Sequence, residues 1–232
     1  VTIYDDITQQ KRAESALLRT NAKLNLLSSI TRHDIRNQLH ALSGYLELAR
    51  LNSQKPESLA GSLKKADAVV ETITRQLEFT KDYEEMGVNA PTWQNVDAIV
   101  SQAVASLPLR GTLIEIERSD LEVYADPLLS KVFYNLIDNA LRYGGAGLTK
   151  IRISSRETDT GLVLTCENDG NGIPTEEKKR LFERGYGKHT GLGLFLSSEI
   201  LSITGISISE NGNPESGARF DMVVPKGEYR FQ

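Results

Sequence analysis

The stretch NLIDNALRY, residues 135–143, mixes apolar and polar side chains at helical spacing. Asn135, Asn139 and Arg142 stand at positions i, i+4 and i+7, so they share one face of a helix. Between residues 129 and 141, the apolar positions of the same segment are expected to form the buried side of that helix. Two amides and a guanidinium on one face need polar partners, either a ligand or a neighbouring loop.

Two glycine-rich clusters follow this helix in the sequence. The first is NDGNGIP, residues 168–174, at the expected end of a strand, and the second is GKHTGLGL, residues 187–194, which opens a further helix. Glycine lets backbone amides approach an anion closely, and a helix N-terminus adds partial positive charge. Each cluster alone is a weak signal, but together with the polar helix face they favour phosphate binding.

The composition of the 232-residue chain is that of a globular protein of one large domain or two smaller ones. A net charge of −4 without a basic run argues against nucleic-acid binding. The single cysteine, Cys166, excludes an internal disulfide and is expected to be a buried thiol on a strand. A cytoplasmic location is expected, because the sequence shows neither a signal-peptide pattern nor a run of about 18 apolar residues, and the full-length protein could be soluble or membrane-tethered.

The amino-terminal third predicts two long helices. Residues 8–51 carry apolar side chains at spacings of three, four or seven, and residues 59–77 repeat the pattern after a break at residues 52–56. A short connection predicts an antiparallel hairpin. Because one hairpin buries its apolar seams poorly, we expect two copies to pair as a four-helix bundle, that is, a homodimer. Steps of four around residue 33 predict a stutter there, unless the seam simply fades over residues 28–32.

A second domain is expected after MGVNAP, residues 86–91. This stretch resembles a linker, and beyond it short predicted strands alternate with helices. Two β-hairpins are predicted, one with strands near residues 150–154 and 162–168, the other near residues 206–208 and 220–224. Asp126 and Pro127 are expected to be the N-cap and the first residue of the helix that contains NLIDNALRY. These elements predict a layered α/β sandwich of about 140 residues.

The order of these motifs resembles the catalytic domain of sensor histidine kinases. Its N, G1, F, G2 and G3 boxes are matched in order by residues 135–143, residues 168–174, Phe182, residues 187–194 and residues 216–220. RHDIRNQ, residues 32–38, looks like the H box on the first helix of the family's phosphotransfer hairpin, and YDDITQQKRAE, residues 4–14, is similar to the tail of a PAS domain and the signalling helix after it. The chain is therefore expected to be a fragment of a longer sensor.

The resemblance implies a fold class and three parts. The class is α+β: a long antiparallel helical hairpin that forms a dimeric four-helix bundle, followed by an α/β sandwich ATP-binding domain of the histidine kinase, gyrase and chaperone type. The parts are the end of a PAS domain and a signalling helix (residues 1–22), a dimerisation and histidine phosphotransfer domain (23–88) and a catalytic ATP-binding domain (89–232). The upstream sensor domain is an expected partner.

The resemblance also implies that His33 is phosphorylated from Mg²⁺-ATP and passes the phosphoryl group to an aspartate in a response regulator receiver domain. Neutral imidazole is a competent nucleophile near pH 7, and Asp34 can orient one of its ring nitrogens. His33 precedes the seam residue Ile35 by two positions, so its side chain should point outward. Asp34 and Asn37 resemble the acid-x-x-Asn arrangement of family members that dephosphorylate their regulator, whereas His40 is expected to be a surface or packing residue.

The nucleotide contacts are likewise implied by the resemblance. Asn139 is the expected Mg²⁺ ligand, Asn135 and Arg142 are expected to meet the phosphates, and Tyr143 is expected to flank the nucleotide. The other expected contacts lie in the glycine-rich clusters: Asn168, Gly170, Gly172, Lys188, Thr190, Gly191, Leu192 and Gly193. Lys188 is expected to lie on a mobile lid between Gly185 and Gly191 or, alternatively, to be an ordinary solvated lysine.

One residue departs from the family pattern. The family's Asp-x-Gly-x-Gly has an Asp that accepts a hydrogen bond from the adenine amino group, whereas this chain has Asn168 in that register and Asp169 one place later. An Asn can accept the bond without charge assistance, which predicts weaker adenine binding. Alternatively, a local shift turns Asp169 inward, although the period of two along a strand opposes it.

Two other functions compete with a kinase. An ATPase of the wider gyrase and chaperone superfamily would need a Glu on the helix of residues 135–143 to activate water, and that helix has none. A nucleotide-binding pseudokinase or a dimeric signalling scaffold is favoured by Asn168.

Overall fold

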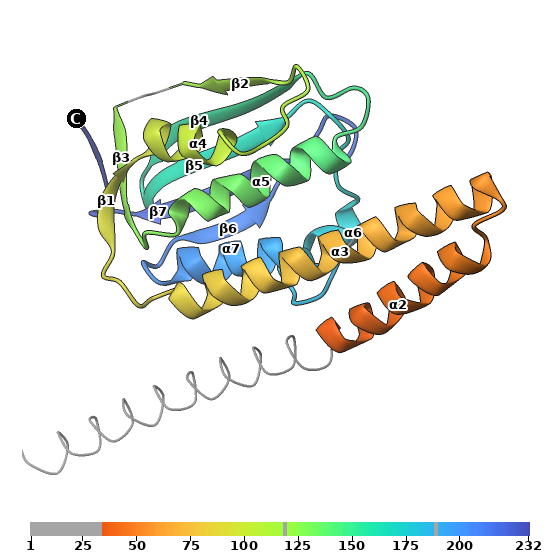
Figure 1. Ribbon diagram of the computed structural model, residues 1–232. Coiled ribbons are helices and arrows are strands. Elements are labelled where there is room, and N and C mark those ends of the chain that lie inside the picture. The colour runs from red at the N-terminus through yellow and green to blue at the C-terminus, as the bar shows by residue number, and fades with distance from the viewer. Residues whose placement is uncertain (1–33, 118–119, 188–189) are drawn as a thin grey trace, which may run out of the picture. The chain divides into compact units, whose positions relative to one another are not determined.

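The computed structural model describes residues 34–117, 120–187 and 190–232 (Figure 1). The chain divides into two compact units, Val1–Lys81 and Asp82–Gln232. None of the helices within the described ranges has the length and the hydropathy that a membrane crossing requires. The predicted stutter at residue 33 and the predicted helix before it lie outside the described residues.

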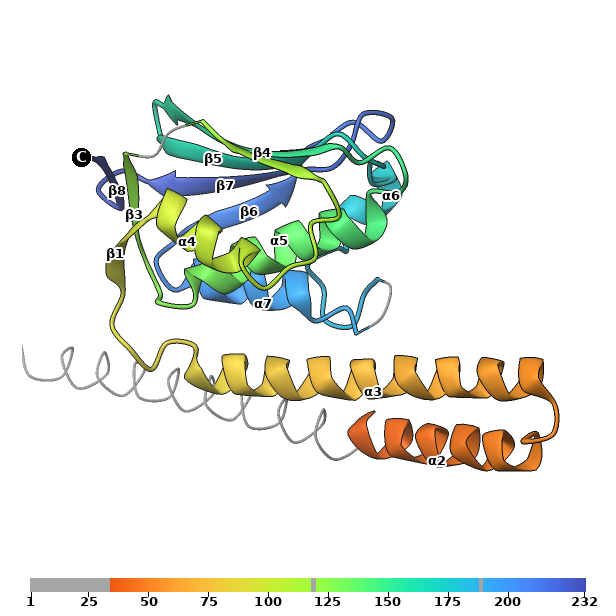
Figure 2. The ribbon, with the colours of Figure 1, turned by 45° about the horizontal axis from the view of Figure 1, so that its top comes forward.

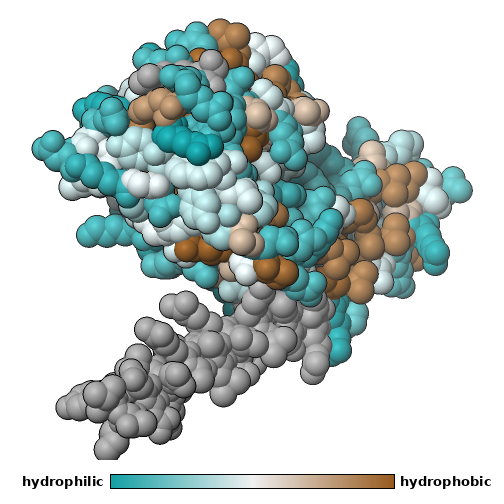
Figure 3. All heavy atoms as spheres, turned by 90° about the vertical axis from the view of Figure 1, so that its left-hand side faces the viewer, coloured by the Kyte–Doolittle hydropathy of each residue, from teal (hydrophilic) through white to brown (hydrophobic). Residues whose placement is uncertain are grey.

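The first unit contains the two predicted long helices, α2 (Ile35–Leu51) and α3 (Pro56–Glu85), of which α3 continues into the start of the second unit. They lie side by side and run in opposite directions (Figures 1 and 2). Within this single chain, the predicted seam residues Ala49 and Ala66 are buried, whereas five others are about half exposed: Leu39 48%, Leu46 43%, Leu63 45%, Val70 48% and Leu77 53%. Figure 3 shows hydrophobic side chains gathered in places on the surface of the face drawn.

The second unit is built on a five-stranded mixed sheet with the order β2-β4-β5-β7-β6. Its strands are β2 (Leu113–Ile116), β4 (Lys150–Thr158), β5 (Gly161–Asn168), β6 (Ser207–Glu210) and β7 (Arg219–Pro225). Strand β2 runs parallel to β4, and the other pairs are antiparallel. Both predicted hairpins, β4 with β5 and β6 with β7, are confirmed.

A second, three-stranded antiparallel sheet has the order β1-β3-β8. It consists of β1 (Thr92–Asn95), β3 (Leu121–Ala125) and β8 (Tyr229–Phe231). The sequence did not predict it, because strands of three to five residues give too few alternations to recognise.

Helices α4 (Val96–Val104), α5 (Leu129–Tyr143) and α7 (Gly193–Ser202) cover one face of the five-stranded sheet, whereas α6 (Thr175–Lys178) is a single turn (Figure 2). Side chains from helices and strands meet in the core between them, and full burial of each contributes about 1.5–3 kcal/mol. The predicted buried side of α5 is confirmed for Leu129, Val132, Phe133, Leu136, Ile137 and Ala140, while Leu141 is half-buried.

The predicted start of α5 was wrong by two residues. A turn at Pro127 and Leu128 precedes the helix, which begins at Leu129. Asp126 stabilises this turn, because its Oδ1 accepts the Leu128 N–H at 2.9 Å and its backbone oxygen accepts the Leu129 N–H at 2.9 Å. Its Oδ2 accepts the Gly87 N–H at 2.9 Å, so this buried carboxylate also fixes the linker beside the start of α5.

Cys166 lies on β5 and is buried, as predicted. Burial raises the pKa of its thiol to about 12, so the group stays protonated and unreactive at neutral pH.

Candidate nucleotide-binding site

Helix α5 presents its polar face opposite its buried one. Asn135 and Asn139 are half-buried, and Arg142 at the carboxyl end is exposed. Arg142 Nε lies 2.8 Å and 2.7 Å from the two carboxylate oxygens of Asp138, one turn earlier. The contact of Arg142 with phosphate stays a prediction. To make it, Arg142 would have to give up its ion pair with Asp138 or share it.

Asn135 joins α5 to the start of α7. Its Nδ2 donates to the backbone oxygen of Gly193 at 3.0 Å and lies 3.2 Å from Ser197 Oγ. A Cβ at position 193 would lie 3.4 Å from the Asn135 amide, an ordinary van der Waals contact, so this approach does not itself require glycine. Both contacts use Nδ2, so a phosphate contact by that nitrogen would require an exchange of partners. The structure thus brings two predicted site residues, Asn135 and Gly193, together.

The other end of α5 meets the first glycine-rich loop. Asn171 N–H donates to the Gly144 backbone oxygen at 2.8 Å, and Asn171 Nδ2 donates to the Tyr143 backbone oxygen at 3.2 Å. A Cβ on Gly170 would lie 2.5 Å from the Gly144 oxygen, so only glycine allows this approach. Tyr143 and Gly170, both predicted site residues, are therefore neighbours.

The register of the loop is fixed by Asp169. Its carboxylate accepts the backbone N–H groups of Thr149 and Lys150, each at 2.9 Å, and the Thr149 hydroxyl. The hydrogen bond from the Thr149 side chain is the largest cause that lowers the pKa of Asp169 to about 2. Asp169 is thus bound to the start of β4, a geometry that does not favour the alternative in which it replaces Asn168.

Asn168 is held within the loop. Its Oδ1 accepts the Gly170 N–H at 3.0 Å, and its Nδ2 makes a long hydrogen bond of 3.4 Å to the Ala218 backbone oxygen. The amide oxygen is therefore oriented by the loop backbone, and it still has a second lone pair with which it could accept from a base.

A backbone hydrogen bond joins the residues on either side of the second glycine-rich cluster's first half, just before α7. Gly185 N–H donates to the Gly191 backbone oxygen at 3.2 Å, and Gly191 has a φ of +59°, which favours glycine. The N-cap residue of α7 is Leu192, whose side chain cannot accept a hydrogen bond. The amides of the first turn are consequently not capped by that side chain, and they suit an anion. Thr190 is half-buried next to this turn, and Lys188 lies outside the described residues.

Residues 125–228 match the family described as Histidine kinase-, DNA gyrase B-, and HSP90-like ATPase. This segment is an ATP-binding domain of the histidine kinase type. The domain's α+β class and mixed sheet agree with the predicted fold.

Two kinds of relative support the same identification. AtoS, a signal transduction histidine-protein kinase of Escherichia coli, is 27% identical over 97% of this chain, which spans 39% of AtoS. The catalytic domain of histidine kinase ThkA, in a nucleotide-free form, is 27% identical with a TM-score of 0.51, covering 60% of this chain and 99% of that domain. A ThkA structure in complex with response regulator protein TrrA shares the fold over 98% of this chain and 68% of its own, with a TM-score of 0.67 and 23% identity.

Asn139 is the Mg²⁺ ligand that the sequence predicts for the ATP-binding domain. Its amide is half-buried in the middle of α5, and an amide oxygen is a hard ligand of the kind Mg²⁺ prefers. In the part of the chain that the structure describes, no three His, Cys, Asp or Glu residues are grouped to hold a metal. A single amide oxygen fits a Mg²⁺ ion that takes its other ligands from phosphate oxygens and water.

The predicted phosphotransfer residues stand outside the ATP-binding domain. His33 lies outside the described residues. Asp34 has helical backbone angles and is half-buried at the start of α2, and Asn37 is exposed one turn later. Asp34 is thus the N-cap residue of α2 and Asn37 lies in its first turn, while their roles stay predictions.

Some polar residues around the loop were missed by sequence reasoning. Glu210 is 6% exposed at the end of β6 and pairs with Lys178, and Asp221 on β7 bonds to Thr165, Asn211 and Arg219. Nothing in the sequence marked these residues, because charged residues on strands normally face solvent.

Proposed function

We propose that the chain is the core of a sensor histidine kinase, which phosphorylates His33 with Mg²⁺-ATP and transfers the phosphoryl group to an aspartate of a response regulator. The observation that carries the proposal is the meeting of three motifs around α5. Asn135 bonds to the first residue of α7, and Gly144 contacts the glycine-rich loop at Asn171. One helix thus connects a loop that can accept a base to a helix terminus that can bind phosphates.

The proposed nucleotide contacts divide along α5. The first-turn amides of α7 and the glycine backbone around Gly191 suit the phosphates, and Asn139 would supply an oxygen to Mg²⁺. Asn168 and Gly170 lie at the opposite end, next to Tyr143, where the purine would bind. Phosphoryl transfer depends mostly on such positioning and on charge neutralisation.

The proposed reaction has two transfers. A ring nitrogen of His33 attacks the γ-phosphorus, the new N–P bond forms as the bond to the bridging oxygen breaks, and ADP leaves. Asp34 would orient the imidazole. A carboxylate oxygen of the regulator's aspartate then attacks the phosphoryl group and releases His33.

A response regulator is the proposed partner of this second transfer. The ThkA chain that shares this fold was crystallised in complex with a response regulator, which supports the proposal. Asp34 and Asn37 on one helical turn support a further role in hydrolysing the phosphorylated regulator.

The half-exposed seam of α2 and α3 supports the proposed homodimer. Contiguous apolar surface on a helix indicates a protein partner, and the seam repeats at intervals of seven at Leu63, Val70 and Leu77 on α3. Pairing of two hairpins as a four-helix bundle would cover it. An upstream PAS sensor domain, which would precede residue 23, is the proposed source of the signal.

Incubation of the chain with γ-labelled ATP and Mg²⁺ tests the proposed function. We expect an acid-labile, base-stable label that His33→Ala abolishes and His40→Ala retains. Binding of ATP without transfer would instead support the pseudokinase or scaffold, and labelling of the His33→Ala variant would refute the assignment of His33.

A further inference from the structure

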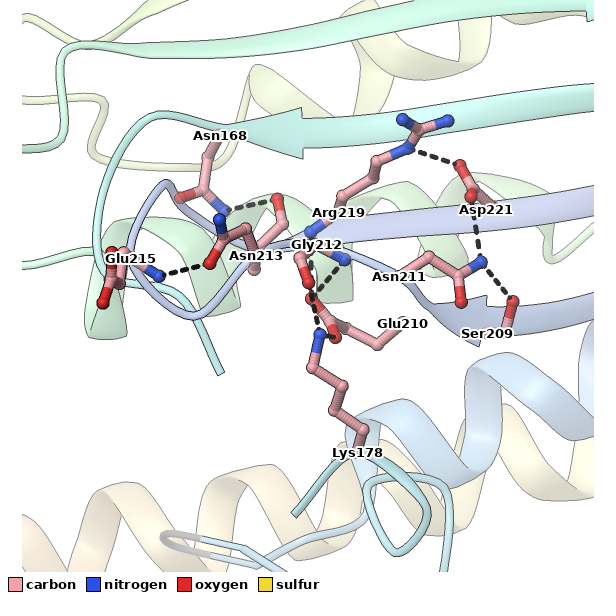
Figure 4. Close-up of polar contacts among 11 residues, drawn as sticks. Asn168, Lys178, Ser209, Glu210, Asn211, Gly212, Asn213, Glu215, Arg219 and Asp221 are labelled. Carbon is pink, nitrogen blue, oxygen red and sulfur yellow. Dashed lines mark hydrogen bonds and ion pairs between the residues drawn. The ribbon is translucent and has the colours of Figure 1, made fainter. Parts of the chain in front are cut away.

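A polar network beside the glycine-rich loop centres on an ion pair between Lys178 and Glu210 (Figure 4). Lys178 Nζ lies 2.6 Å from Glu210 Oε2, and the Lys178 and Glu210 side chains are 16% and 0% exposed. Lys178 Nζ also donates to the Gly212 backbone oxygen at 2.5 Å. The pair joins α6, which follows the loop in the chain, to the end of β6.

Glu210 shapes the turn between β6 and β7. Its Oε1 accepts the N–H groups of Gly212 and Arg219, each at 3.1 Å, so one carboxylate oxygen bridges both sides of the turn. Asn211 N–H donates to the Arg219 backbone oxygen at 2.8 Å and completes the base of the turn.

The same turn supports the glycine-rich loop, residues 168–174. Asn168 N–H donates to the Ala218 backbone oxygen at 3.0 Å. A Cβ on Gly172 would lie 2.5 Å from the backbone oxygens of Asn213 and Pro214, so the loop and the turn are in direct backbone contact. The loop, α6, the ion pair and the turn therefore form a closed ring of contacts.

Stability alone is a poor explanation for such a pair. Removing two charges from water costs free energy that their attraction often only just offsets, and an apolar pair of similar volume is commonly as stable. A buried ion pair does, however, define one geometry, because both charges lose their compensation when they separate. The loop that it holds contains two glycines, which leave the backbone little conformational restraint of its own.

We propose that Lys178 and Glu210 are positioning residues for the nucleotide site, holding the glycine-rich loop against the β6–β7 turn in the form that binds ATP. The proposal rests on the proposed function. It predicts that loss of the ion pair weakens ATP binding beyond any loss of stability, because a loop that is less restrained on the side of the turn must be ordered when the nucleotide binds.

The decisive variant is Lys178→Met combined with Glu210→Gln in the full chain. Gln keeps an oxygen that accepts from Gly212 and Arg219 but needs no countercharge, so the fold should be retained. We expect a melting temperature close to that of the unchanged chain and a Kd for Mg²⁺-ATP, by titration calorimetry, about tenfold higher. The KM for ATP in autophosphorylation should rise similarly, with kcat unchanged.

Two single variants serve as controls. Lys179→Met removes an exposed neighbouring lysine and should leave the Kd unchanged, and Lys178→Arg keeps the charge and should hold the Kd within about twofold. Unchanged affinity in the double variant would overturn the proposal, as would a double variant that fails to fold, since the pair would then be needed for stability. Failure of the unchanged chain to bind Mg²⁺-ATP would instead contradict the proposed function.

Discussion

The carboxylate of Asp169 accepts the backbone N–H of Lys150 at 2.9 Å, and this contact directs Asp169 toward the start of β4. The side chain of its neighbour Asn168 is directed into the glycine-rich loop instead, where its Oδ1 accepts the Gly170 N–H. The chain therefore offers a neutral amide where the family pattern has a carboxylate.

Asn168→Asp should strengthen ATP binding. A charged acceptor makes a hydrogen bond roughly twice as strong as a neutral one, and a gain of about 1 kcal/mol corresponds to a Kd about fivefold lower. Titration calorimetry with Mg²⁺-ATP measures the change, and Asn89→Asp, which adds the same charge at an exposed linker position, should leave the Kd unaltered. Weaker binding by Asn168→Asp would argue that residue 168 does not accept from the base.

Asn139→Ala should uncouple nucleotide binding from Mg²⁺. Loss of an oxygen ligand removes part of the charge compensation at the phosphates, so autophosphorylation should fall about 100-fold at fixed Mg²⁺. In EDTA, which removes Mg²⁺, Asn139→Ala and the unchanged chain should bind ATP with similar affinity, because neither then holds the metal. Asn139→Asp, which keeps an oxygen ligand, should still respond to Mg²⁺, and an equal loss of affinity with and without Mg²⁺ would contradict the assignment.

Asp169 should stabilise the ATP-binding domain in a pH-dependent way. Hydrogen bonds, first that of the Thr149 side chain, lower its folded pKa to about 2, below the usual value of about 3.9 in an unfolded chain. A lowered pKa contributes stability above about pH 4 that disappears as the pH falls through about 2.

The comparison of the unchanged chain with Asp169→Asn tests this. Because the carboxylate is largely exposed, solvent screening limits the effect to a melting temperature about 2 °C lower at pH 7. Thermal unfolding followed by circular dichroism should show the difference shrinking between pH 4 and pH 2. A difference that stays constant over that range would mean that the charge of Asp169 has no part in it.

Val70→Lys should dissociate the proposed dimer. Val70 is 48% exposed in the single chain, and a lysine there would place a charge inside the seam of a four-helix bundle. Sedimentation equilibrium should show a monomer at concentrations where the unchanged chain is a dimer. Lys64→Glu, at an exposed polar position of the same helix, should remain dimeric. A monomeric unchanged chain would contradict the bundle.

The long helices and the buried face of α5 could be predicted from the sequence. Leucine spacing predicts α2 and α3, and the apolar residues of α5 predict its buried side, because periodicity over many residues outweighs local exceptions. The start of α5 could not be placed, since Asp126 caps a turn instead of the helix itself.

The candidate site could be predicted as a set of motifs but not as a set of contacts. The glycines mark the loop, yet its close approaches to Gly144 and Pro214 depend on segments distant in the sequence. Lys178 and Glu210 gave no signal, because a lysine on a short helix and a glutamate on a short strand usually face solvent, and only the tertiary structure pairs them.

The position of the phosphoryl group after incubation with Mg²⁺-ATP tests the central claim most directly. The account predicts that mass spectrometry of a digest kept at neutral or alkaline pH finds phosphohistidine at His33, and that the rate of this modification falls about 100-fold when Asn139 is changed to Ala. Phosphorylation at His40 or at another residue, or an unmodified His33 in a chain that binds ATP, would contradict it.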